Sequence, residues 1–202
     1  IAAPKGPASP PEADEPVTWR RRLHWLILAF APSSLLLGVT AHITTDVASV
    51  PLLWVIPLAL YLLTFVIVFA RRPWLRHAWM VKAQPFIVIP ITFLFWWNLR
   101  IPPLFVFLHL LVFFATTMVC HGELVRRRPA ADHLTEFYLW VSVGGMMGGV
   151  FNVMIAPIVF DSIHEFPIAL ILACMLRPVL VDGGATPWRR DVVFPLLLFA
   201  VF

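Results

Sequence analysis

The stretch Cys120–Asn152, CHGELVRRRPAADHLTEFYLWVSVGGMMGGVFN, decides the fold of this chain. Acidic residues and histidines stand beside a run of three arginines, and two overlapping glycine pairs follow. Apolar sequence lies on both sides of it. The pattern predicts a helical hairpin, in which one membrane helix ends near His121, a short polar loop turns the chain, and a second helix begins near Leu134.

The composition supports a membrane protein. Of the 202 residues 60% are hydrophobic and only 13% are charged, and the mean hydropathy is +0.87. Soluble domains carry about 25% charged and 45–50% apolar residues, so a chain this apolar is not expected to fold around one water-soluble core. The sequence therefore predicts an all-α, polytopic transmembrane helix bundle.

Apolar runs predict about six full spans and a truncated seventh. Pro32 is expected to kink the first span, Thr45 or Asp46 to begin the second helix, and the fifth span to tilt or break near Pro157. The expected spans cover residues 23–39, 50–70, 81–97, 103–120, 134–160 and 166–180, with a partial one at 192–202.

The basic residues predict the topology. When the loops are assigned to alternate sides, Arg100 alone of the 15 lysines and arginines falls on one side. The other side holds Lys5, Arg20, Arg21, Arg22, Arg71, Arg72, Arg76, Lys82, Arg126, Arg127, Arg128, Arg177, Arg189 and Arg190. Cytoplasmic loops are enriched in such residues, so the N-terminal segment and the Arg126–Arg128 loop are expected in the cytoplasm. The charge of +4 reflects this topology and does not indicate nucleic-acid binding.

Residues 1–19, rich in proline and alanine, are expected to form a flexible linker before a transmembrane domain at 20–202. The last apolar run, 192–202, is shorter than the roughly 20 residues that a span needs. We therefore expect the sequence to be a fragment of a longer chain.

Two polar clusters are candidate sites. On the cytoplasmic side, His121 and Glu123 end the fourth span, while Asp132, His133 and Glu136 begin the fifth. Because the loop between them is short, His121 and Glu123 are expected within reach of Glu136. Such a group can shuttle a proton or hold a cationic ligand. The alternative is helix-end chemistry, with Asp132 as an N-cap and Glu123 paired with Arg126 or Arg127.

The outer cluster combines two loops. It comprises His42, Thr44, Thr45 and Asp46 with Asp161, His164 and Glu165. Their spacing matches no metal motif, and no cofactor motif is evident, so neither a metal nor a cofactor is predicted. His109 lies alone on the apolar face of the fourth span and is expected to form a hydrogen bond to a neighbouring helix.

The glycines favour close helix packing. Gly144 and Gly148 are four residues apart, as are Gly145 and Gly149, which is the doubled small-residue pattern of membrane helix interfaces. Asn152 lies near the same face, where a partner helix or a cavity water would satisfy its amide. A polar cavity is the alternative to packing. A nucleotide-binding loop is excluded because no strand precedes these glycines.

Two runs resemble a known family. LAFAPSSLLLGVTAHITTDVASVPLLWVIPLALYLLTFVIVFARR (28–72) and CHGELVRRRPAADHLTEFYLWVSVGGMMGGVFNVMIAPIVF (120–160) are similar to the membrane domain of bacterial fused transporter-like/spermidine-synthase-like proteins. The resemblance implies a bacterial protein of the inner membrane, with further membrane helices before this region, a cytoplasmic aminopropyltransferase-like domain after it, and a link to polyamines by fusion alone.

Three functions remain open at this point. The chain is either a membrane domain that anchors a cytoplasmic domain and binds or moves a small cation, an accessory or scaffold subunit of a larger membrane complex, or a membrane enzyme that uses an acid and histidine cluster. The sequence contains no complete catalytic motif. The expected partners are the lipid bilayer and other transmembrane helices. The candidate polar path comprises His121, Glu123, Glu136 and Asn152, with Asp46 and His42 at its outer mouth.

Overall fold

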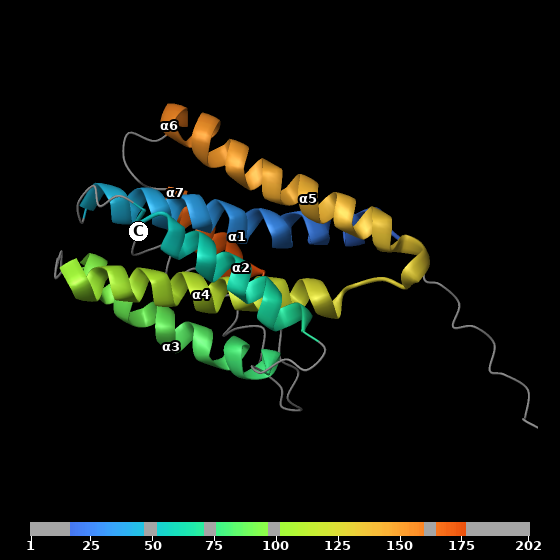
Figure 1. The fold of residues 1–202 in the computed structure, drawn as a ribbon, viewed down its shortest axis with the longest axis horizontal. Coiled ribbons are helices and arrows are strands. Elements are labelled where there is room, and N and C mark those ends of the chain that lie inside the picture. Colours follow the sequence, from blue (N-terminus) through green and yellow to red (C-terminus); the bar gives the residue numbers. More distant parts are fainter. Residues whose placement is uncertain (1–16, 47–51, 71–75, 97–101, 160–164, 177–202) are drawn as a thin grey trace, which may run out of the picture.

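The computed structural model describes residues 17–46, 52–70, 76–96, 102–159 and 165–176, and this part of the chain is all helical (Figure 1). It contains six helices. They are α1 (Trp19–Asp46), α2 (Val55–Phe69), α3 (His77–Trp96), α4 (Pro102–Arg126), a continuous fifth helix, and α7 (Glu165–Met175). The fifth helix consists of η1 (Ala131–His133), α5 (Leu134–Val150), the π-turn η2 (Phe151–Ile155) and α6 (Ala156–Val159).

Three of these helices are long and apolar enough to cross a membrane. They cover Trp19–Thr44, Leu104–Arg126 and Ala131–Val159, with 26, 23 and 29 residues. A span of the hydrocarbon core needs roughly 20 mostly apolar residues. These helices indicate a membrane protein with several spans.

The described helices differ from the expected six full spans. Three qualify by length and composition, whereas α2 has only 15 residues and α7 only 11. The expectation that Thr45 or Asp46 begins the second helix is wrong, because α1 continues through Asp46. The hydroxyls of Thr40 and Thr44 donate to carbonyls one turn back, at 2.6 and 2.9 Å, so these polar residues stay within the helix.

The fifth helix is irregular close to where a break was expected. Its π-turn ends at Ile155, two residues before Pro157. Proline has no N–H to donate to the preceding turn, and a local π-turn is one way in which a membrane helix adjusts to it. The helix continues through this irregularity to Val159.

Contacts define the helix directions. Trp25 packs on Phe137, and further along both helices Phe30 packs on Phe151, so α1 and α5 are parallel (Figure 1). The start of α1 meets the end of α4, where the Trp25 indole donates to the carbonyl of Arg127, so this pair is antiparallel. The end of α1 meets the start of α4 through His42 and Phe105.

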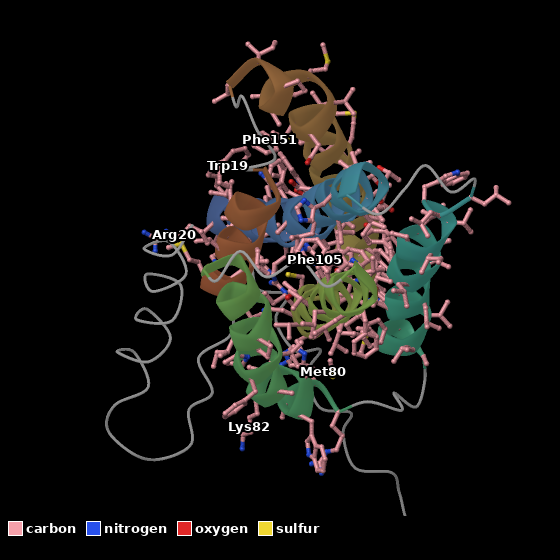
Figure 2. All side chains as sticks on the ribbon, turned by 90° about the vertical axis from the view of Figure 1, so that its left-hand side faces the viewer. Trp19, Arg20, Met80, Lys82, Phe105 and Phe151 are labelled. Carbon is pink, nitrogen blue, oxygen red and sulfur yellow. The ribbon has the colours of Figure 1, made fainter. Side chains whose placement is uncertain are left out.

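One end of the bundle collects the positive charge. Every lysine and arginine of the described residues belongs to the start of α1, the start of α3 or the end of α4 and its following loop. Lys82 points away from the bundle (Figure 2). We call this the basic end. In the described part, the basic residues therefore gather at one end of the helices.

The two glycine pairs have different roles in the packing of α1 on α5. A Cβ at Gly144 would overlap the carbonyl of Leu26, and one at Gly148 would lie 2.6 Å from the carbonyl oxygen of Phe30. By contrast, a Cβ at Gly145 would meet nothing within 4 Å. Ser33 donates to the carbonyl of Gly145 at 2.8 Å across the same interface. The absence of a side chain at Gly144 and Gly148 therefore lets the two backbones approach closely.

The other side of the fifth helix is open. In its most apolar 18-residue stretch, only 17% of the residues are buried, against 56% in the corresponding stretch of α1 and 61% in that of α4. Its exposed apolar side chains are Tyr138, Leu139, Met146, Met147, Val150, Val153, Met154, Ile155, Ile158 and Val159. Lipid or further helices can cover this face, whereas water cannot do so favourably.

The two glycine pairs are expected to respond differently to alanine. Gly148→Ala should lower the thermal midpoint of the detergent-solubilised protein, because the new methyl group forces α1 away from α5 at a cost of about 1–3 kcal/mol. Gly145→Ala is the matched control and should leave the midpoint unchanged. Equal midpoints for the two variants would contradict the assigned interface.

Candidate functional site

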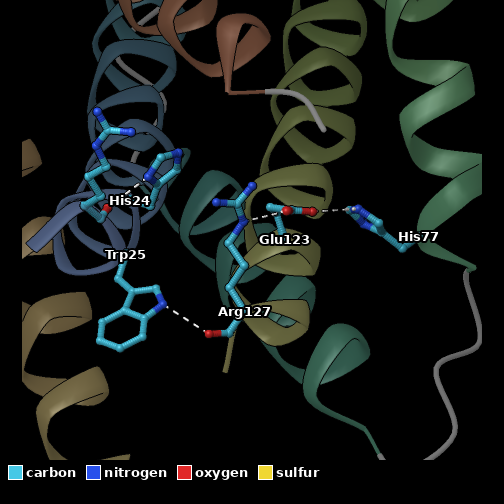
Figure 3. A network of polar contacts seen from close by, with 6 residues as sticks. His24, Trp25, His77, Glu123 and Arg127 are labelled. Atoms are coloured by element: carbon cyan, nitrogen blue, oxygen red, sulfur yellow. Dashed lines mark hydrogen bonds and ion pairs between the residues drawn. The ribbon is translucent and has the colours of Figure 1, made fainter. Parts of the chain in front are cut away.

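Glu123 is the centre of a polar network at the basic end (Figure 3). Its side chain is buried near the end of α4, with one oxygen accepting a hydrogen bond from Arg127 Nε at 2.6 Å. Its other oxygen lies 3.5 Å from His77 Nε2, which comes from the first residue of α3. The carboxylate therefore links the end of α4 to the start of α3.

Gly122 makes room for the histidine of this network. A Cβ at this position would overlap the imidazole of His77. Its distance to the ring atom Cε1 would be 2.8 Å. The ring of His77 thus rests against the backbone of α4, beside Glu123. A glycine directly before the acid leaves the space that this imidazole occupies.

Arg127 joins the network to α1 and α5. Its carbonyl accepts a hydrogen bond from Trp25 Nε1 at 3.1 Å, and the Trp25 ring lies edge-on to Phe137 with centroids 5.2 Å apart. The Arg21 guanidinium lies over the Trp25 ring, 5.6 Å from its centroid. Helices α1, α3, α4 and α5 are therefore tied together at one level of the basic end.

Glu136 has a separate partner. It forms an ion pair with Arg22 of α1 at 2.5 Å, and His133 on its own helix lies 4.0 Å away. Asp132 is exposed in the turn that precedes α5. The short loop places Glu123 and Glu136 at the same end of the bundle, as expected, but each acid has its own arginine.

His121 faces α2. Its Nδ1 lies 2.9 Å from the hydroxyl of Thr64, which donates its single hydrogen to the carbonyl of Tyr61 at 2.6 Å. The hydroxyl must therefore accept a hydrogen from Nδ1, which leaves the lone pair on Nε2. This buried Nε2 has no hydrogen-bond partner among the described residues. The ring packs against Phe65, with centroids 3.8 Å apart.

At the opposite end, two histidines that are distant in sequence meet. The rings of His42 and His109 are 4.7 Å apart, and His109 Nδ1 donates to the carbonyl of Phe105 at 2.8 Å. That bond is to the helix's own backbone, whereas the expected bond was to a neighbouring helix. Both rings also contact the ring of Phe105. In the described part, no group of three or more residues is arranged to hold a metal ion.

Several residues of the predicted outer mouth lie outside the description. Asp161, His164 and Arg100 are outside the described residues, as are the side chains of Thr45, Asp46 and Glu165. Asp46 is placed only as the last residue of α1. The outer mouth therefore stays a prediction.

The structure adds residues that the sequence analysis missed, namely His77, Arg22 and Thr64. Each belongs to a helix distant in sequence from the acid or histidine that it contacts. His77 directly follows a basic loop, and nothing in its local sequence marks it as a partner of Glu123. The glycine before Glu123 was the one available signal, because a glycine next to a buried charge often marks a close approach.

Comparisons with known proteins add no assignment: no protein-family model, no curated protein and no solved structure matches this chain. The resemblance to spermidine-synthase-like fusion proteins stays a prediction.

The contact between Gly122 and the His77 ring can be tested with a double-mutant cycle. Gly122→Ala should destabilise the protein by about 1–3 kcal/mol, because the new methyl group displaces the His77 ring. In a His77→Ala background the same change should have little effect, since no ring remains to be displaced. Thermal midpoints of the four proteins in detergent measure this cycle. If the two substitutions changed the thermal midpoint additively, the His77 ring would not lie against Gly122.

Proposed function

We propose that this chain is the membrane domain of a larger bacterial protein, which anchors a cytoplasmic domain and binds or moves a small cationic molecule. The observation that carries the proposal is the basic end. Its arginines mark a cytoplasmic face, and the buried carboxylate of Glu123 lies at the same level. The resemblance to spermidine-synthase-like fusion proteins supports a polyamine as the cation and a synthase-like domain as the cytoplasmic partner.

The proposal includes the shorter helices in the membrane domain. Helices α2 and α3 both pack against α4, and α7 packs against α1. Near the basic end, Thr64 of α2 contacts His121 and His77 of α3 contacts Glu123. A helix of 15 residues such as α2 is about 22 Å long, which is short for a bilayer of about 30 Å but sufficient with some local thinning. The shorter helices would then complete the membrane domain around α4.

The chemistry of cation binding would rest on Glu123. Among the acids whose side chains are described, it alone is buried. Arg127 binds one of its oxygens at 2.6 Å, whereas the other has the longer contact of 3.5 Å with His77 Nε2. The side chain of Arg127 is partly exposed, so it can turn toward water while an ammonium group takes its place. A carboxylate binds such a group through charge-assisted hydrogen bonds.

A scaffold role is the second candidate. The open face of the fifth helix favours it, because a partner helix that covered this face would bury a continuous row of apolar side chains. In this role the chain would position other membrane subunits and bind no small molecule.

The topology can be tested with reporter fusions. A reporter fused after Arg127 should lie in the cytoplasm, and one fused after Asp46 should lie outside the cell membrane, because the arginines hold the basic end inside. Paired fusions to alkaline phosphatase and to a fluorescent protein measure both positions. An extracellular reporter at Arg127 would overturn the proposed orientation.

Cation binding can be tested with spermidine. In lipid nanodiscs, Glu123→Gln should weaken spermidine binding about tenfold or more, the effect of losing a hydrogen bond between charged groups. Glu123→Asp keeps the charge and should bind better than the glutamine variant. Asp132→Asn removes an exposed acid at the same end and serves as the matched control. Unchanged binding in Glu123→Gln would remove Glu123 from the site.

A further inference from the structure

The arginines of the basic end outnumber the acids that could neutralise them. The start of α1 and the end of α4 with its loop hold six arginines, namely Arg20, Arg21, Arg22, Arg126, Arg127 and Arg128. The acids with described side chains at this end are Glu123, Asp132 and Glu136. Arg127 is paired with Glu123 and Arg22 with Glu136, so the other four arginines have no acidic partner among the described residues.

The Trp25 indole brings these unpaired arginines to one place. The Arg21 guanidinium lies over the Trp25 ring, and the indole Nε1 donates to the carbonyl of Arg127 at 3.1 Å (Figure 3). Arg20 directly precedes Arg21, and the two remaining unpaired arginines flank Arg127 in the sequence. All four therefore border a single junction between the start of α1 and the end of α4.

The guanidinium groups at this junction can be reached from outside the bundle. Arg20, Arg126 and Arg128 are exposed, and Arg21 is partly exposed. Like charges around one junction repel one another, and a bound anion reduces that repulsion. Guanidinium groups bind phosphate oxygens through paired, charge-assisted hydrogen bonds. The junction is therefore suited to a phosphate group.

The surroundings of the junction match a lipid headgroup rather than a free phosphate ion. Trp19 is exposed beside Arg20 and packs edge-on to Trp140 of α5, with centroids 5.5 Å apart. Tryptophans gather at the headgroup level of a membrane. Leu23 lies about one turn after Arg20 and is also exposed, so apolar surface begins directly next to the arginines. A phospholipid presents a phosphate followed by acyl chains in the same order.

We propose that Arg20, Arg21, Arg126 and Arg128 form a binding site for the phosphate headgroup of an anionic phospholipid. The arginines bind the phosphate oxygens at the junction of α1 and α4, and an acyl chain lies along α1 past Leu23. This inference goes beyond the proposed cation function and does not rest on it, because the site uses neither oxygen of Glu123.

The site predicts a preference for phosphatidylglycerol over phosphatidylcholine. The two lipids are compared with identical acyl chains, so that the headgroups alone differ. The protein in detergent is titrated with each lipid, and native mass spectrometry measures the bound fraction. Phosphatidylglycerol should bind about tenfold more tightly, because its headgroup has no choline cation to oppose the arginines.

Single substitutions locate the site. Arg20→Gln, Arg21→Gln and Arg128→Gln should each weaken phosphatidylglycerol binding about fivefold, the usual contribution of one basic residue near anionic lipid. Binding of phosphatidylcholine should stay unchanged. Arg76→Gln is the matched control, because Arg76 is an exposed arginine of the basic end that precedes α3 and does not border the Trp25–Arg127 contact.

Loss of the site can be separated from loss of the fold. The side chain of Arg20 has no hydrogen bond or ion pair with the described residues, so Arg20→Gln should keep the thermal midpoint of the lipid-free protein. Arg21→Gln also removes the contact with the Trp25 ring. All variants are therefore compared by size-exclusion chromatography and thermal midpoint before lipid is added.

Three outcomes would overturn the site. The first is equal binding of the two lipids. The second is an equal loss in Arg76→Gln and Arg20→Gln, which would indicate a diffuse attraction to the whole basic end. The third is displacement of phosphatidylglycerol by an equal concentration of glycerol phosphate, which would make a soluble phosphate the occupant. Spermidine enters none of these measurements, so a failure of the cation function would leave the lipid site standing.

Discussion

The close approach of the α1 and α5 backbones at Gly144 and Gly148 is the constraint on which the described structure depends. The carbonyls of Leu26 and Phe30 occupy space that any side chain at these two positions would need. In a membrane, helices gain little from the hydrophobic effect when they associate, so dispersion contacts between closely packed backbones and interhelical hydrogen bonds must hold them together. The bonds from Ser33 to Gly145 and from Asn152 to Ser34 both form within this contact.

The same approach organises the basic end. Because α1 lies along α5, Arg22 reaches Glu136, and Trp25 packs on Phe137 while it donates to the carbonyl of Arg127. Arg127 in turn binds Glu123, whose other oxygen faces His77 in the space above Gly122. Glycines thus allow close contacts at two helix interfaces, one between α1 and α5 and one between α3 and α4.

Polar side chains within the helices are satisfied in different ways. Thr40, Thr44 and Thr64 donate to carbonyls of their own helix, which satisfies them without a partner helix. His121 and Asn152 instead each bond to another helix and keep one buried acceptor atom without a partner in the described part. In lipid such atoms are unfavourable, so each of them invites a functional question.

Much of the architecture was predictable because it follows from local chemistry. The apolar runs and scarce charges predicted an all-α membrane protein, and the arginine clusters predicted which helix ends lie together. Glycines four residues apart predicted a packing surface, and the Glu123–Arg127 pair follows from helical spacing. The count of six full spans was not reached in the described part, because apolar composition does not fix where a helix begins and ends.

The tertiary structure alone decided which distant residues meet. The sequence indicated that Gly144, Gly145, Gly148 and Gly149 favour packing, yet only the position of α1 shows that Gly144 and Gly148 are the ones in closest contact. Likewise, the sequence predicted that Glu123 lies near Glu136. In the structure, Glu123 instead contacts His77, and Glu136 forms an ion pair with Arg22. The physical reason is that periodicity determines the face of a helix on which a residue lies, whereas its partner depends on how the other helices are arranged around it.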